Sequence, residues 1–153
     1  MKKILFLIIA LFSVCILSGC GKNDNIKILK CSGVNKGNNM NAYGEVKYTF
    51  KDDKLSKAEL TATFKDITID DLSSQWDSIK TQFTEQNEPV EEVGYKRLVR
   101  SDDKNYTFTV LLEIDFEKIS KETMEKYEVS YSKDITYEEV KKDTEEEGTF
   151  VCE

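Results

Sequence analysis

The chain has 153 residues, with 29 acidic and 22 basic side chains and a net charge of −7 at pH 7. This acidic balance excludes the class of nucleic-acid-binding proteins, which bind phosphate through basic patches. The sequence contains no histidine, which excludes Ser-His and Cys-His catalytic pairs and histidine-ligated zinc sites.

The N-terminus has the three parts of a bacterial secretory signal. Lys2 and Lys3 form a positive start, and residues 4–17 form an apolar run. The run is about 14 residues long, which is short of the roughly 20 that a transmembrane helix needs. The motif Leu-Ser-Gly-Cys that ends at Cys20 resembles a lipobox. We therefore expect cleavage that removes residues 1-19 and a diacylglycerol on Cys20; an ordinary signal peptide or an uncleaved anchor is the alternative.

Lipid on Cys20 would hold the mature chain at the extracytoplasmic face of the cell membrane. Residues 20-25 are expected to form a short tether, because five residues reach at most about 17 Å. The remaining residues 26-153 suit a single domain. Without the signal the net charge becomes −9, and the sequence shows no Lys/Arg cluster that would draw this body toward an anionic surface.

Two cysteines, Cys31 and Cys152, remain in the mature domain besides the lipidated one. Outside the membrane such a pair is expected to form a disulfide, which would close nearly the whole domain into one loop. Two buried reduced thiols are the alternative. A metal site is not expected, because two cysteines without histidine leave zinc short of ligands.

The first half of the domain predicts strands. A strand is expected over residues 26–31, followed by a loop rich in Gly and Asn over residues 32–41. Residues 42–51 and 55–65 alternate apolar and polar side chains, the period of half-buried strands. We expect them to form a hairpin that turns at Asp52-Asp53.

The period then changes to that of an amphipathic helix. One apolar stripe contains Leu72, Trp76, Ile79 and Phe83. Asp70 and Asp71 suit the N-terminus of this helix as cap and as charges near the positive end of its dipole. We expect Trp76 to lie in the core.

Two further strands are predicted over residues 95–101 and 106–116, joined by an Asp-rich turn. Residues 119–131 predict either a short helix capped by Ser120 or a strand. A capping box of Thr136 and Glu139 marks the start of a last helix. A short final strand over residues 150–152 would return the chain to the sheet.

Together these patterns predict an α+β domain. We expect an antiparallel sheet of about five or six strands, with two or three helices packed on one face.

Four segments of the chain resemble those of the YehR-like small lipoproteins of bacteria. They are the lipobox at Cys20, the hairpin of residues 48–54, the strand end of residues 113–118 and the tail of residues 135–150. The resemblance implies a similar fold and an extracytoplasmic setting, and it brings no catalytic residues. The cysteine pair departs from that family's pattern, which suggests a sister group.

The polar sides of the predicted strands are rich in hydroxyl groups. If the strands are neighbours, they make an open platform for a polar ligand that contains Thr49, Thr61, Thr63, Thr107 and Thr109. The alternative is that threonine is there because β-branched residues suit half-solvated strands. Adjacent carboxylates in turns, such as Asp102-Asp103, are expected to be solvated and not catalytic.

We expect a non-enzymatic binding module, anchored to the membrane through Cys20, that recognises an envelope component or another protein. The alternative is a carrier of small molecules or ions with a groove between sheet and helices. No catalytic residues, cofactor, resident metal or nucleic-acid partner are expected.

Overall fold

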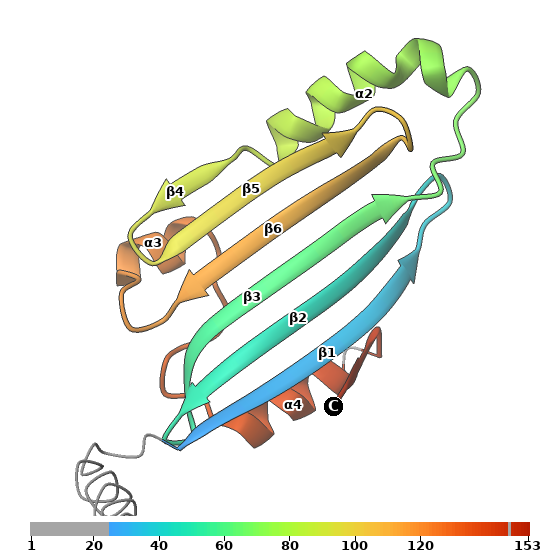
Figure 1. The fold of residues 1–153 in the computed structure, drawn as a ribbon. Helices are drawn as coiled ribbons and strands as arrows, with labels where there is room; N and C mark the ends of the chain where they lie inside the picture. Colours follow the sequence, from blue (N-terminus) through green and yellow to red (C-terminus); the bar gives the residue numbers. More distant parts are fainter. Residues whose placement is uncertain (1–24, 147) are drawn as a thin grey trace, which may run out of the picture.

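The computed structural model describes residues 25–146 and 148–153. The expected signal of residues 1–19, Cys20 and the tether as far as residue 24 lie outside this part of the chain. The described residues form one antiparallel sheet with helices on one side of it (Figure 1). The α+β class predicted from the sequence is confirmed.

The sheet contains seven strands in the order β4-β5-β6-β3-β2-β1-β7, and all neighbours are antiparallel. Their bounds are β1 Ile26–Lys36, β2 Asn41–Lys51, β3 Lys54–Lys65, β4 Val90–Glu92, β5 Tyr95–Asp102, β6 Thr107–Asp115 and β7 Phe150–Cys152. The count exceeds the five or six expected because β4 is too short to show a period of two. Strand β1 also continues past residue 31, because pairing with β2 extends it through the Gly- and Asn-containing segment.

Three helices lie in the described residues: α2 (Leu72–Gln86), α3 (Lys121–Lys126) and α4 (Tyr137–Glu146). An aromatic residue in each helix, or at its end, packs against an aromatic residue on the same face of the sheet. The pairs are Phe83 with Phe108, Tyr127 with Tyr95, and Tyr137 with Phe50. We call this the helix face, and the opposite side the open face. The prediction of two or three helices on one face agrees with this arrangement.

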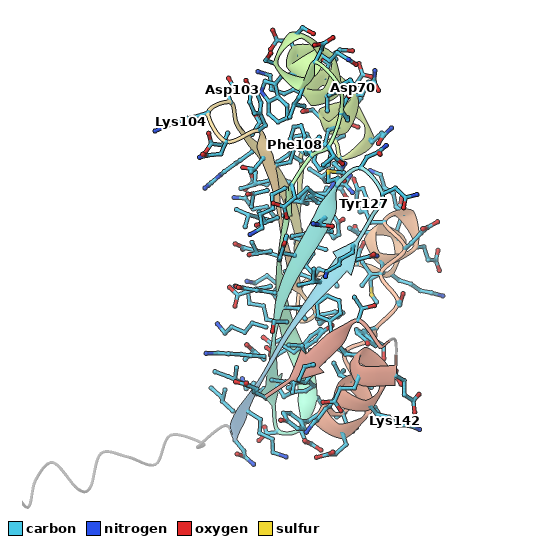
Figure 2. All side chains as sticks on the ribbon, turned by 90° about the vertical axis from the view of Figure 1, so that its right-hand side faces the viewer. Asp70, Asp103, Lys104, Phe108, Tyr127 and Lys142 are labelled. Atoms are coloured by element: carbon cyan, nitrogen blue, oxygen red, sulfur yellow. A yellow bond between two sulfur atoms is a disulfide. The ribbon has the colours of Figure 1, made fainter. Side chains whose placement is uncertain are left out.

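The core beneath α2 is aromatic. Phe108 of β6 is stacked on Phe83 and on Trp76, with ring centroids 4.1 and 4.7 Å apart. Trp76 is buried, as predicted, and its indole N–H donates to Asp103 Oδ1 at 2.7 Å. Lys80 donates to the same oxygen at 3.0 Å. The β5–β6 turn, where Figure 2 labels Asp103, is thus held against α2.

A second and larger core lies beneath α3 and α4. Its fully buried members come from β1, β2, β3 and α4 and are Leu29, Phe50, Leu55 and Val140. Helix α3 begins at Ser120, whose hydroxyl accepts from the N–H of Thr123, so the helical alternative for this segment is the correct one. The capping box predicted for α4 is confirmed, since Glu139 accepts from the backbone and hydroxyl of Thr136.

The start of α2 differs from the prediction. Asp71 occupies the N-cap position, but its side chain makes no capping hydrogen bond and its φ is 53°. Instead, the carbonyl of Asp71 accepts from the N–H groups of Ser74 and Gln75. Capping residues typically have an extended backbone, from which the left-handed backbone of Asp71 departs, so residue type alone was not sufficient to predict the cap.

The β2–β3 turn is made of two non-glycine residues with positive φ, Asp52 at 51° and Asp53 at 65°. Two-residue hairpins of this conformation favour glycine, because a Cβ is strained in the left-handed region. Asp53→Gly is therefore expected to raise the free energy of unfolding by up to about 1 kcal/mol, even though it removes an exposed ion pair with Lys27. Urea denaturation measures this change.

Asp53→Ala is the matched comparison for the turn. It removes the same ion pair but keeps a Cβ in the left-handed region, so it is expected to be less stable than Asp53→Gly. Equal stabilities for the two variants would show that the backbone angle at this position does not limit the fold.

Strand β7 closes one edge of the sheet. Cys31 of β1 and Cys152 of β7 are directly paired and form a disulfide across a sequence separation of 121 residues. The predicted pairing is confirmed. Phe150 lies over Gly44 of β2, where an added Cβ would come within 2.8 Å of the ring. Glycine at position 44 therefore leaves room for the Phe150 ring.

Candidate functional site

The open face of the sheet is not covered by α2, α3 or α4. Figure 2 views the sheet close to edge-on and shows side chains projecting from one side while the helices lie on the other. These side chains are mostly polar, whereas their neighbours along each strand point into the two cores. The open face is therefore the largest surface on which the fold leaves sheet side chains in solvent.

The five threonines predicted to form a platform all lie on the open face. Thr63 and Thr109 are direct partners across β3 and β6. Thr61 precedes Thr63 by two residues in β3, and Thr107 precedes Thr109 by two residues in β6. Because the strands are antiparallel, these two threonines lie on opposite sides of the Thr63–Thr109 pair. Thr49 lies apart from them, opposite Lys57. Four of the threonines thus form one continuous patch, and their role in binding a ligand stays a prediction.

Charged side chains form a row across the open face. Its members are paired from strand to strand in the order Lys30, Lys47, Glu59, Glu113, Lys96 and Glu91. Lys47 and Lys57 donate to the two oxygens of Glu59, at 2.9 and 3.0 Å. These hydrogen bonds, that from Lys47 first, lower the pKa of the Glu59 carboxyl. The carboxylate stays ionised at neutral pH and links the neighbouring strands.

The charge of the open face differs from that of the whole chain. Over β1 to β6 it carries nine basic side chains, which are Lys30, Lys36, Lys47, Lys51, Lys54, Lys57, Lys65, Lys96 and Arg100. Against them stand six acidic ones, Glu45, Glu59, Glu91, Asp102, Glu113 and Asp115. The acidic excess of the protein therefore lies elsewhere, and this face does not repel an anionic partner as the net charge suggests.

A shallow basin of about 490 Å³ lies on the open face over β7, β1, β2 and β3. Lys30, Glu45 and Lys47 line it with charge, and Thr61 is the platform threonine that reaches it. Val151, which is 71% exposed, adds an apolar wall. The basin combines both charge signs, a hydroxyl and an apolar contact, which suits a polar ligand.

A second hollow lies on the opposite side of the sheet. This helix-side groove has a volume of about 600 Å³. Its floor is formed by Val46 and Leu60 of the sheet, and α4 and the segment before it form its sides. The sequence alternative of a groove between sheet and helices agrees with the place of this hollow, but the sequence named no lining residues for either hollow, because they are far apart in the chain and meet only through strand register.

The described residues give no support to a metal centre or a spanning helix. Among residues 25–146 and 148–153, no group of three or more His, Cys, Asp or Glu side chains could hold a metal ion. Within the same residues, no helix is both long enough and apolar enough to cross a membrane.

Comparisons of the chain with protein-family models, with curated proteins and with solved structures gave no match. The resemblance to the YehR-like lipoproteins stays a prediction that depends on the four segments named above. The fold and the two hollows define the chain as an α+β domain with one face of its sheet uncovered.

Proposed function

We propose that the protein is a lipid-anchored extracytoplasmic binding module, not an enzyme, and that its open face meets an envelope component or a protein partner. The observation that carries this proposal is the uncovered face of a seven-stranded sheet. Its side chains combine a threonine patch, charges of both signs and a basin with exposed Val151. Exposed Ile28 and Val34 of β1 lie on the same face as Val151, and an apolar patch bordered by polar residues is typical of an interaction site.

The anchor is tested by the intact mass of the protein extracted from membranes. We expect a chain that begins at Cys20 and carries the added mass of a diacylglycerol. Cys20→Ser is expected to remain uncleaved and without lipid. A wild-type mass that still includes Met1 would contradict both the cleavage and the anchor.

The open face is tested by photo-crosslinking in intact cells. A benzoylphenylalanine at position 109 replaces Thr109 at the centre of the open face, and the control replaces the exposed Glu125 on α3. We expect a discrete crosslinked species from position 109 that is absent from position 125. The same species from both positions, or none from position 109, would contradict a specific role for the open face.

A carrier of small molecules is the second candidate function, and the helix-side groove is the observation that favours it. Its volume of about 600 Å³ falls within the range of small-ligand sites, about 300 to 1,000 Å³. The groove lies between sheet and helices, where a carrier site was expected. Binding there would leave the open face available.

A further inference from the structure

We infer that the helix-side groove binds a small organic ammonium ion with an aromatic or alkyl body. The inference rests on the second candidate function and does not depend on the open face. The volume of the groove, about 600 Å³, is that of a small-molecule site. A protein partner would instead need an extended contact of about 800 Å² on each side.

The floor and sides of the groove are apolar and aromatic. Val46 and Leu60 form the floor, and the rings of Tyr48, Tyr131 and Phe150 also line the groove. Tyr131 meets Tyr48 edge to face, with centroids 6.0 Å apart. Because aromatic faces are electron-rich, a ring that presents its face to a hollow attracts a cation as well as an apolar body.

The rim of the groove is acidic. Asp143 and Glu146 of α4 line it. Lys142 approaches Glu146 at 3.7 Å, in a pair whose side chains are 70% and 65% exposed. Asp143 has no ion-pair partner among the described residues. The groove thus offers at least one carboxylate that is free to attract a cation, and it disfavours an anion of the same shape.

Hydrogen bonding inside the groove does not favour a different class of ligand. The hydroxyl of Thr144 lines the groove but donates to the Val140 carbonyl at 2.7 Å. Buried side-chain polar atoms in the described part of the chain all have partners. Ser130 and Tyr131 also bring hydroxyl groups to the lining, but a hydroxyl both donates and accepts and so does not distinguish a cation from an anion. Charge and ring contacts are therefore the properties that select the ligand.

The test compares three probes of nearly equal shape: benzylammonium, benzoate and benzyl alcohol. Each is titrated against the full chain in detergent, with detergent alone as blank, and binding is followed by ligand-observed NMR. We expect benzylammonium to bind at least about tenfold more tightly than either of the others. Equal binding of the three, or no benzylammonium binding up to about 10 mM, would overturn the inference.

Variants locate the site. Asp143→Asn, at an exposed position, is expected to weaken benzylammonium binding about fivefold, and Tyr131→Leu, which keeps an apolar side chain, about tenfold. Glu145→Gln lies on the same helix but does not line the groove, so it is expected to bind as wild type. Thermal unfolding confirms that each variant is folded. An equal loss in Glu145→Gln, or no loss in Asp143→Asn and Tyr131→Leu, would contradict the site.

These results are separable from those of the open face. Failure of benzylammonium to bind would contradict the inference about the groove but would not change the crosslinks expected at position 109. Absence of those crosslinks would contradict the role of the open face but would not change the result expected from the probe titrations.

Discussion

Phe108→Ala is expected to lower the free energy of unfolding by about 3 to 5 kcal/mol, as measured by urea denaturation. The Phe108 side chain is 1% exposed and lies between Phe83 and Trp76 of α2. Removing the ring leaves a cavity that α2 cannot fill, because its two aromatic side chains are already packed against the sheet. The loss should therefore include a cavity term as well as the lost burial.

The neighbouring residue provides the control. Thr109 follows Phe108 in β6 but points to the open face, opposite Thr63. Thr109→Ala is expected to change stability by no more than about 0.5 kcal/mol. Comparable losses in the two variants would contradict the assignment of the two faces.

Replacing both Cys31 and Cys152 by alanine is expected to lower the free energy of unfolding by about 2 to 5 kcal/mol. The disulfide closes a loop across 121 residues, and a cross-link over so long a loop removes much of the freedom of the unfolded chain. Strand β7 pairs with β1 over only three residues, and the covalent bond adds to this short pairing. Urea denaturation with and without a reductant measures the effect.

The reductant separates the bond from the substitution. Wild-type protein in reductant should approach the stability of the double alanine variant, and the variant itself should not respond to reductant. A wild type that keeps its full stability after reduction would show that the disulfide does not stabilise the fold.

The parts of the fold that the sequence predicted are those set by local patterns. Alternation in residues 42–51 and 55–65 predicted the faces of β2 and β3, because side chains in a strand alternate whatever it pairs with. The apolar stripe through Trp76 predicted α2 because the period of an amphipathic helix is also a local property of the sequence. The capping box of Thr136 and Glu139 needs only neighbouring residues, and it forms as expected.

The parts that the sequence did not predict depend on contacts between distant residues. Strand β4 is three residues long and exists because β5 pairs with it. The lysines of the open face come from separate strands, and no run along the chain reveals that they share one surface. The helix-side groove likewise joins Val46 and Leu60 to Asp143, which lies about 80 residues farther along the sequence.

The two proposed binding surfaces lie on opposite sides of one sheet. The basin on the open face and the helix-side groove share Val46 as a lining residue. The strand backbone separates them, so a ligand in one hollow does not block the other. If both proposals hold, the open face and the helix-side groove can be occupied at the same time.

The disulfide also has a consequence for proteolysis. Every peptide bond between Cys31 and Cys152 lies inside one covalent ring. A protease that cuts a single exposed connection within it, such as residues 66–71 or 128–134, opens the ring but releases no fragment. A nicked molecule would keep both pieces together until the disulfide is reduced, and electrophoresis without reductant would still show one intact band.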